Sequence, residues 1–431
     1  MASVPLTLAP LSGPRDRTWP VPGSKSLTNR ALLLAAVAEG TSRLTGVLAS
    51  DDTRHMRSCL TAMGATIRDV GADALEVSGG LSRLRAPTEP LFVGNSGTTV
   101  RFCAALAALL PGTTTFVGDE HMAKRPIADL VDGLRQLGVE VRCATGCPPL
   151  TVVGGAISAR SLTMRGDRSS QYFTALLQIA GLIGDGLEVR LDGPLVSVPY
   201  VEMTRRLVAD FGGRIDLIGG GDRIVPGQTT GFVARTAAYR GRDYRIEPDA
   251  SSASYPFALA AAGGHRITVE LDRTSLQGDY GFVDLLEQMG ATVERAEGRT
   301  TVIGTGRLLG IDADMHHISD IVMTLAAIAP LATGPTTIRN IANIRIKETD
   351  RLLATVTELR RLGQQVEHGD DWLRIHPRPV TPATVECYAD HRMAMSFAVL
   401  GSIVPGVTIA DPACTAKTYP GFWNDLAGFG R

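Results

Sequence analysis

The segment Ser24-Lys25-Ser26-Leu27-Thr28-Asn29-Arg30, followed by an apolar run over 31–38 and by Gly40, contains the pattern on which the whole chain is built. Its hydroxyl-rich start suits a helix N-cap, its Ala/Leu-rich run predicts a helix that is apolar nearly all round, and the glycine marks the end of the helix. The same order of features occurs six times. The closing glycines follow at intervals of 72, 74, 78, 70 and 72 residues: Gly40, Gly112, Gly186, Gly264, Gly334 and Gly406. So regular a period predicts an internally repeated architecture.

The other five runs also start with hydroxyl, amide or carboxylate groups. These starts read Asn95-Ser96-Gly97-Thr98, Ser169-Ser170-Gln171, Ser251-Ser252, Ser319-Asp320 and Asp390-His391-Arg392. Capping explains a Ser or an Asp there, but it does not explain Lys25, Arg30, Gln171 and Arg392 in or beside the first turns. A helix N-terminus carries roughly half a positive charge, so a cation is poorly placed there unless an anion is bound. The pattern therefore predicts an anion-binding site where these helix starts meet.

A second repeated feature completes the unit. An apolar residue and a glycine, first seen at Met63-Gly64, precede an alternating stretch that is typical of a β-hairpin. One unit thus consists of a helix, a strand, a loop, a second helix, a strand, a turn and a strand. The sixth unit ends without its strand pair, and we predict that the segments Pro5 to Ala9 and Trp19-Pro20-Val21 supply it.

Six such units predict two similar domains of three units each. The first domain would cover residues 22–243, and the second would combine residues 1–21 with residues 244–431. The chain would then cross twice, near Pro22-Gly23 and near Arg240-Gly241-Arg242. We therefore expect a two-strand hinge and a ligand site in the cleft between the domains.

Composition argues against several classes of function. The chain has 431 residues and 44% apolar content, enough for two cores, while its net charge of −1 and its 5% aromatic content disfavour a nucleic-acid partner. The six cysteines lack the spacing of a zinc site, so no metal is expected, and reduced thiols suit a cytoplasmic protein. No apolar run reaches the ~18 residues of a membrane span. We expect a monomer with no membrane partner.

Charged residues outside the helix starts gather in three loops at equivalent places in the repeat. These are Lys124-Arg125-Pro126, the segment from Arg345 to Arg351, and the loop around Lys417. With the helix starts, they resemble the signatures of the 5-enolpyruvylshikimate-3-phosphate synthase (EPSP synthase) family, from about residue 20 to residue 424. The matching stretches are 22–30, 94–98, 124–127, 197–200, 249–255, 345–351, 390–395 and 414–418.

The resemblance implies an α/β (α+β) fold of two domains, each made of three βαβαββ units in an inverted α/β barrel-like arrangement. It also implies a transferase of the shikimate pathway to chorismate and the aromatic amino acids. Such an enzyme moves the enolpyruvyl group of phosphoenolpyruvate to the 5-hydroxyl of shikimate 3-phosphate and releases phosphate. The two substrates bring two phosphates and two carboxylates, which suits the cations identified above. No cofactor or metal is expected, because phosphoenolpyruvate carries its own leaving group and cations can stabilise the developing charge.

The resemblance also implies site residues, carried over motif by motif. Proton transfer would involve Asp320 as the base at the 5-hydroxyl, Glu348 as the acid and base at the methylene, and Lys25 near both. Shikimate 3-phosphate would be held by Lys25, Ser26, Arg30, Ser169, Ser170, Gln171, Ser197, Tyr200, Asp320, Asn343 and Lys347. Phosphoenolpyruvate would be held by Lys25, Asn95, Gly97, Arg125, Gln171, Arg351, Arg392 and Lys417.

Two other functions stay open at this point. A UDP-N-acetylglucosamine enolpyruvyl transferase shares the architecture, but it uses a cysteine in a mobile loop, and residues 118–125 contain none. A non-catalytic anion-binding protein on the same scaffold would be expected to have lost Asp320, Glu348 or Lys25, and all three are present. We also expect inhibition by glyphosate, because Gly97 leaves room for it, although Phe102 stands where many family members carry proline.

Overall fold

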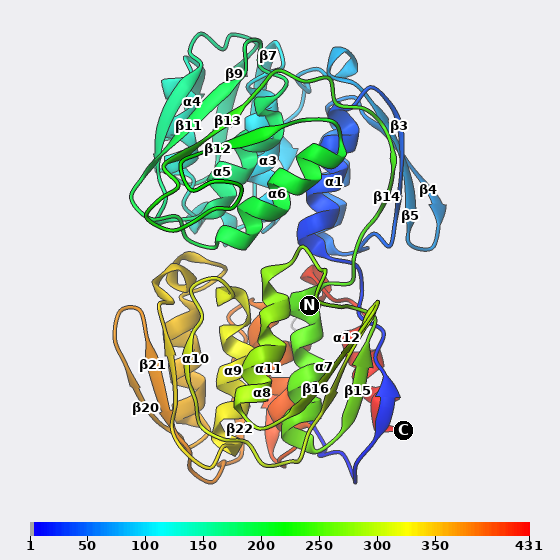
Figure 1. Ribbon diagram of the computed structural model, residues 1–431, viewed down its shortest axis with the longest axis vertical. Coiled ribbons are helices and arrows are strands. Elements are labelled where there is room, and N and C mark those ends of the chain that lie inside the picture. Colours follow the sequence, from blue (N-terminus) through cyan, green and yellow to red (C-terminus); the bar gives the residue numbers. More distant parts are fainter. Residues whose placement is uncertain (1–3) are drawn as a thin grey trace. The chain divides into compact units, whose positions relative to one another are not determined.

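The computed structural model, which describes residues 4–431, shows the predicted elements of each repeat in the predicted order (Figure 1). Each of the first five repeats ends with one more strand than the sequence pattern predicts, which gives the two helices and four strands of a βαβαββ unit. The first repeat contains α1 (Lys25–Val37), β3 (Gly40–Thr45), α2 (Asp51–Ala62), β4 (Thr66–Gly71), β5 (Ala74–Gly79) and β6 (Leu91–Phe92). The second contains α3 (Gly97–Ala107), β7 (Gly112–Val117), α4 (Ala128–Gln136), β8 (Glu140–Arg142), β9 (Leu150–Gly154) and β10 (Ser161–Arg165). The third contains α5 (Ser170–Ala180), β11 (Leu187–Asp192), α6 (Val198–Asp210), β12 (Ile215–Ile218), β13 (Gly231–Ala234) and β14 (Asp243–Arg245).

The later repeats follow the same plan. The fourth contains α7 (Ala250–Gly263), β15 (Arg266–Val269), α8 (Phe282–Gln288), β16 (Thr292–Ala296), β17 (Arg299–Ile303) and β18 (Asp312–Asp314). The fifth contains α9 (Val322–Ile328), β19 (Thr336–Arg339), α10 (Arg351–Arg361), β20 (Gln365–His368), β21 (Leu373–His376) and β22 (Ala383–Val385). The sixth contains α11 (His391–Gly401), β23 (Val407–Ile409) and α12 (Phe422–Gly430), and it is completed by β1 (Leu6–Thr7) and β2 (Asp16–Thr18).

Strand pairing closes the first three repeats into a ring. The last strand of each repeat pairs in parallel with the first strand of the next, which gives the sheets β6-β7-β9-β8 and β10-β11-β13-β12. The ring closes where β14 pairs in parallel with β3, so that strands some 200 residues apart in the chain share one sheet. Residues Gly23–Glu247 accordingly form one compact domain, which we call the first domain. The expected boundary after residue 243 is therefore wrong by a few residues, because it would cut β14 and remove it from the sheet of β3.

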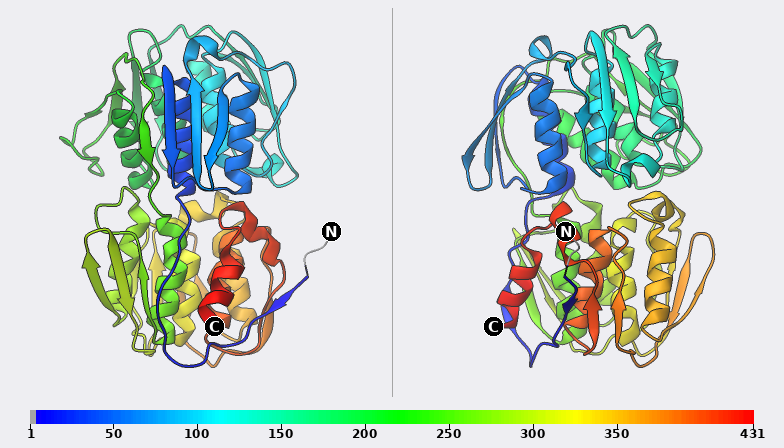
Figure 2. Two further views of the ribbon diagram at one scale, coloured as in Figure 1. Left: turned by 90° about the vertical axis from the view of Figure 1, so that its right-hand side faces the viewer. Right: turned by 180° about the vertical axis from the view of Figure 1, so that it is seen from behind.

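The remaining residues, up to Pro22 and from Pro248 to Arg431, form the second domain. β1 pairs antiparallel with β23, and β2 pairs in parallel with β15, so the N-terminal segment does complete the sixth repeat. Both views of Figure 2 show this dark blue segment beside the red C-terminal elements. β1 is shorter than the predicted Pro5 to Ala9, and the predicted second strand is misplaced, because β2 ends at Thr18, just before Trp19-Pro20-Val21. The buried ring of Trp19 packs on Phe429 with centroids 5.3 Å apart, and Pro20, which follows it, has no N–H to continue a ladder.

The first helix of each repeat forms the core of its domain, as the all-round apolar pattern predicts. Nearly every residue of α1, α3 and α5 is buried in the first domain, and the same holds for α7, α9 and α11 in the second. The sheet of the first repeat packs closely against α1 at a position that carries glycine. A Cβ on Gly79, at the end of β5, would overlap the carbonyl oxygen of Ala36 in α1.

Five of the six first helices carry a side-chain N-cap. The caps, with the backbone N–H that each accepts, are Ser24 with Leu27, Ser96 with Thr99, Ser169 with Gln171, Asp249 with Ser252, and Asp390 with Arg392. The fourth repeat thus starts at Asp249, two residues before the predicted start. The fifth repeat differs, because a 3₁₀ turn, Ser319–Ile321, precedes α9 and no side chain caps the helix. The carboxylate of Asp320 is therefore not used for capping.

Candidate active site

Side-chain hydrogen bonds join the N-terminal turns of the three core helices of the first domain. The bonds run from Asn29 of α1 to Thr98 of α3 (2.7 Å), from Arg101 of α3 to Gln171 of α5 (2.9 Å), and from Arg30 of α1 to Thr174 of α5 (3.4 Å). The three N-termini therefore lie at the same end of the domain, where their partial positive charges add. The predicted meeting of helix starts is found within this domain.

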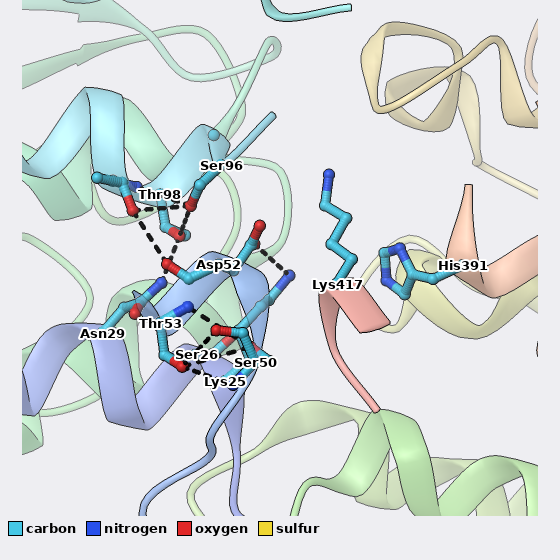
Figure 3. Close-up of polar contacts among 12 residues, drawn as sticks. Lys25, Ser26, Asn29, Ser50, Asp52, Thr53, Ser96, Thr98, His391 and Lys417 are labelled. Atoms are coloured by element: carbon cyan, nitrogen blue, oxygen red, sulfur yellow. Dashed lines mark hydrogen bonds and ion pairs between the residues drawn. The ribbon is translucent and has the colours of Figure 1, made fainter. Parts of the chain in front are cut away.

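Lys25 begins α1 and reaches toward the next helix. Its Nζ lies 3.7 Å from Oδ2 of Asp52, in the first turn of α2, and the side chains are only 14% and 5% exposed (Figure 3). Ser50 and Thr53 close a capping box at the start of α2, which holds that turn in place. The Asp52 carboxylate thereby fixes the position of the Lys25 ammonium group.

Arg30 is the most deeply buried arginine among the described residues of the first domain. Its Nε donates to Thr204 (2.9 Å) and its Nη1 to the carbonyl of Ser26 (2.8 Å), and the guanidinium lies 5.8 Å from the ring centre of Tyr200 and 5.4 Å from that of Phe102. Burial lowers the pKa of Arg30 to about 10, so the group remains charged at neutral pH. Within residues 4–431 it forms no ion pair with a carboxylate, and a buried charge without a counter-charge favours an anionic ligand.

The start of α3 leaves no room for a side chain at position 97. A Cβ on Gly97 would lie 2.7 Å from Nη2 of Arg125 and still closer to Nη1 of Arg101. Arg125 is 5% exposed and its Nη1 donates to both the carbonyl (3.0 Å) and the side-chain oxygen (3.1 Å) of Asn95. Arg101 donates to the carbonyl of Gly97 (3.1 Å) and to that of Pro126 (2.9 Å). Two guanidinium groups thus meet at the glycine-containing helix start.

The N-termini of α5 and α6 provide hydroxyl groups beside this cluster. Ser169 caps α5, and the following Ser170 is 4% exposed. Ser197 occupies the N-cap position of α6 in a left-handed conformation (φ 52°) and makes no capping bond, so its hydroxyl is not used to cap that helix. The carbonyl of Tyr200, in the first turn of α6, accepts from Arg30 (3.4 Å). Both helix starts are thus connected through Arg30 to α1.

Asp320 is the centre of the charged cluster in the second domain. Its carboxylate lies 3.5 Å from Nζ of Lys347, 3.3 Å from Nη1 of Arg351 and 3.0 Å from Nη2 of Arg392. These cations come from the loop before α10, from α10 itself and from the first turn of α11. One carboxylate therefore gathers three of the predicted binding residues.

Arg351 connects this centre to two more carboxylates. Its Nη2 lies 2.7 Å from Glu348, and its Nε and Nη2 form a bidentate pair with Asp390 (2.7 and 3.2 Å). Burial acts to lower the pKa of Arg351, but the carboxylates of Asp390, Glu348 and Asp320 outweigh it and raise the pKa above its ordinary value. The arginine stays charged in a site that is almost closed to solvent.

The other predicted residues of the second domain join the same cluster. Lys417 Nζ lies 3.2 Å from Glu348, and Asn343 donates to Ser319 (3.0 Å) beside Asp320. Burial lowers the pKa of Lys347, against the effect of Asp320. A carboxylate missing from the sequence analysis, Asp279, accepts the hydroxyl of Ser251, and burial together with the charge of Asp320 raises its pKa to about 6.

The predicted residues thus form one cluster in each domain. The first domain holds Lys25, Ser26, Arg30, Asn95, Gly97, Arg125, Ser169, Ser170, Gln171, Ser197 and Tyr200, and the second holds Asp320, Asn343, Lys347, Glu348, Arg351, Arg392 and Lys417. Sequence reasoning missed the residues that hold these groups in place, among them Asp52, Arg101 and Asp390. Asp390 stands in a quoted motif, and Arg101 lies one helical turn after Gly97, so both were within reach of the pattern.

Comparison with known proteins now identifies the family. Residues 16–426 match the model of EPSP synthase (3-phosphoshikimate 1-carboxyvinyltransferase). The chain belongs to the EPSP synthase family. A 3-phosphoshikimate 1-carboxyvinyltransferase of Nostoc punctiforme is 45% identical over 419 residues, 96% of each chain, and one of Shewanella baltica is 42% identical over 423 residues, 94% of this chain and 95% of the relative.

The fold is that of the family as well. The structure of an EPSP synthase from Acinetobacter baumannii matches with a TM-score of 0.77 and 25% identity over 99% of this chain and 98% of the other. Among residues 4–431, no helix has the length and apolar character needed to cross a bilayer, and no group of His, Cys, Asp and Glu side chains is arranged to hold a metal ion.

Proposed function

We propose that this protein transfers the enolpyruvyl group of phosphoenolpyruvate to the 5-hydroxyl of shikimate 3-phosphate and releases phosphate. The observation that carries the proposal is the family match over residues 16–426, which includes every residue of the two charged clusters. The matched relatives are named for this activity, which favours it over UDP-N-acetylglucosamine as acceptor and over a non-catalytic role.

Shikimate 3-phosphate would bind mainly to the first domain. Lys25, Ser26 and Arg30 would take its carboxylate and ring, and the buried charge of Arg30 supports this role because it lacks a carboxylate partner within residues 4–431. The phosphate would meet the hydroxyl-rich starts of α5 and α6 and one lysine of the second domain. These phosphate ligands are Ser169, Ser170, Ser197 and Lys347, with Gln171, Tyr200, Asn343 and Asp320 around the ring.

Phosphoenolpyruvate would bind at Arg125, which donates to Asn95, and at four cations that pair with carboxylates: Lys25, Arg351, Arg392 and Lys417. The arginines suit the bidentate recognition of a carboxylate or a phosphate, and the lysines act as point charges. The proposed ligands are Lys25, Asn95, Gly97, Arg125, Gln171, Arg351, Arg392 and Lys417.

The chemistry needs one proton acceptor and one group that can give and take a proton. The 5-hydroxyl oxygen attacks C2 of phosphoenolpyruvate while C3 gains a proton, and the tetrahedral intermediate then loses phosphate and a proton from C3. Asp320 would accept the hydroxyl proton, and the position of its carboxylate among three proposed substrate-binding cations supports that role. Glu348 pairs with both Arg351 and Lys417. Together with Lys25 it would donate the proton to C3 and later remove a proton from C3.

A phosphate-release assay tests the proposal. Phosphate should appear from phosphoenolpyruvate only when shikimate 3-phosphate is present. Release with UDP-N-acetylglucosamine instead would assign the protein to the other enolpyruvyl transferase activity. Binding of both ligands without any release would assign it to the non-catalytic role.

Replacing Glu348 by Gln should lower kcat by about 10² or more and leave the affinity for shikimate 3-phosphate nearly unchanged. The amide keeps the size of the side chain but cannot move a proton at C3. Steady-state phosphate release and calorimetric titration with shikimate 3-phosphate measure the two quantities. The control is Glu367→Gln, which removes an exposed carboxylate paired with His376 in the same repeat (2.7 Å). Similar turnover in both variants would exclude Glu348 from proton transfer.

Gly97→Ala should raise the KM for phosphoenolpyruvate about tenfold and weaken inhibition by glyphosate at least as much. The new Cβ would lie 2.7 Å from Nη2 of Arg125, so the guanidinium must move from its present place. A tenfold change corresponds to about 1.4 kcal/mol of binding free energy. We measure KM for phosphoenolpyruvate and the inhibition constant of glyphosate at several phosphoenolpyruvate concentrations.

Gly184→Ala is the matched control for this substitution. Gly184 has no left-handed φ, and a Cβ there would meet nothing within 4 Å, so both constants should stay at the wild-type values. If Gly97→Ala behaves like this control, position 97 does not border the phosphoenolpyruvate site. Glyphosate inhibition that phosphoenolpyruvate does not relieve would contradict the expected competition.

We also propose a cytoplasmic, monomeric state. The six cysteines are free thiols, as a reducing compartment favours. Light scattering coupled to gel filtration measures the mass, and a value of about twice 45.6 kDa would contradict the monomer.

A further inference from the structure

The loop between β22 and α11 holds two neighbouring residues in the left-handed region. Tyr388 has a φ of 55° and Ala389 a φ of 52°. This region is unfavourable for residues with a Cβ, and such a conformation persists only where the surroundings enforce it. Asp390, which follows directly, caps α11, and Arg392 lies in the first turn. The strained pair therefore determines where these two charged side chains are placed.

Glu358 of α10 forms hydrogen bonds with the first part of this loop, which follows β22. Its side chain is completely buried, and its two oxygens accept the backbone N–H of Glu386 (3.0 Å) and the hydroxyl of Tyr388 (2.6 Å). Burial and the neighbouring Glu358 carboxylate raise the pKa of Tyr388 to about 12, so the hydroxyl is protonated and donates. Hydrogen bonds to an ionised acceptor are about twice as strong as neutral ones, and so this carboxylate is a firm anchor.

The same helix holds the other end of the loop. Arg351 forms the bidentate pair with Asp390 described above, and it lies seven residues before Glu358. Seven residues are about two turns, so both side chains project from one face of α10. The strained pair is thus fixed on both sides by one helix. Arg351 belongs to the proposed substrate site, whereas Glu358 has no role in the chemistry proposed above.

We propose that Glu358 is a positioning residue for the phosphoenolpyruvate site. It keeps Tyr388 and Ala389 in the left-handed conformation and thereby sets the positions of Asp390 and Arg392. The inference rests on the proposed function, since it takes Arg392 as a ligand of phosphoenolpyruvate. A purely structural carboxylate would affect stability alone, whereas a positioning residue changes the affinity for one substrate in particular.

Glu358→Gln tests this role together with Ala389→Gly. The glutamine keeps the shape but loses the charge, and we expect the KM for phosphoenolpyruvate to rise about tenfold, as for other groups that orient a ligand-binding residue. The KM for shikimate 3-phosphate should change by less than about twofold. Glycine adopts the left-handed conformation without a Cβ penalty. The double variant Glu358→Gln/Ala389→Gly should therefore recover to within about threefold of the wild-type KM.

Glu202→Gln is the matched control. Glu202 lies on the second helix of the third repeat, accepts the backbone N–H of Ile224 (2.9 Å) and pairs with Arg205 three residues later (2.7 Å), as Glu358 does with Arg361 (3.4 Å). Its loop leads to no proposed ligand, so the variant should keep both KM values. The proposal is overturned if Glu358→Gln keeps the wild-type KM for phosphoenolpyruvate, if both KM values rise equally, or if Ala389→Gly gives no recovery.

Failure of the proposed function can be distinguished from failure of this inference. It appears as wild-type protein that releases no phosphate with shikimate 3-phosphate. The effect on the loop is then measured from the urea unfolding midpoints of four proteins: the wild type, Glu358→Gln, Ala389→Gly and the double variant. Ala389→Gly should raise the midpoint more in the Glu358→Gln background than in the wild type, because the anchor no longer holds the left-handed pair. Equal shifts in both backgrounds would overturn the inference.

Discussion

Replacing Asp320 by Asn is expected to lower kcat about a thousandfold, while the KM for shikimate 3-phosphate rises less than about tenfold. The amide cannot accept the proton of the 5-hydroxyl, and it also removes the negative charge shared by Lys347, Arg351 and Arg392. The loss of the base should act on kcat and the loss of the charge on binding, so the two effects separate in the kinetics. Steady-state phosphate release with both substrates varied measures them.

Asp314→Asn is the control for this experiment. Asp314 lies six residues earlier, at the end of β18, and its carboxylate accepts the backbone N–H of His316 (3.0 Å) and the amide of Asn340 (2.7 Å). It contacts none of the three cations, so its replacement should leave kcat within about twofold. If Asp320→Asn retains a tenth or more of the wild-type kcat, Asp320 is not the base.

The repeat could be predicted because its signals are local. A polar helix start, an apolar run and a closing glycine lie within about 20 residues of one another, and each repeat contains them all. The pairing that closes each domain is not local. β14 joins β3 from the far end of the first domain, and nothing in the residues Asp243–Arg245 indicates that partner. The predicted boundary therefore fell within that strand.

The sequence could predict which charged side chains belong to the candidate site, but not which of them form ion pairs with one another. Cations at helix starts identified Lys25, Arg30 and Arg392 because a charge of that sign is unexpected there. Apart from the family resemblance, the sequence pattern predicted only a helix cap for Asp320. In the structure a 3₁₀ turn precedes α9, and the Asp320 side chain does not cap the helix.

The positioning role of Glu358 could not be predicted from the sequence for a related reason. Glu358 stands in an ordinary helical sequence, and its partner Tyr388 is 30 residues away. The left-handed conformation of a tyrosine and an alanine has no signal in the residue types, since glycine is the residue normally found there. Such contacts depend on how helix and loop pack in three dimensions.

Replacing Arg351 by Met should lower the free energy of unfolding by about 3–5 kcal/mol, the largest effect on stability that we expect from one substitution. Arg351 is 1% exposed, and the Asp390 carboxylate that it pairs with is completely buried. Methionine fills much of the volume but leaves that carboxylate without its counter-charge in a medium of low dielectric constant. Urea unfolding followed by circular dichroism measures the loss.

Two further variants show whether the uncompensated charge is the cause. Arg351→Met/Asp390→Asn removes the buried charge and keeps an N-cap for α11, so it should regain more than half of the loss. Arg339→Met removes an arginine from an exposed pair with Asp312 and should change stability by no more than about 0.5 kcal/mol. If the double variant is as unstable as Arg351→Met, lost packing rather than lost charge accounts for the effect. A recovery would show that this arginine neutralises the Asp390 carboxylate and so keeps the start of α11 folded around the proposed phosphoenolpyruvate site.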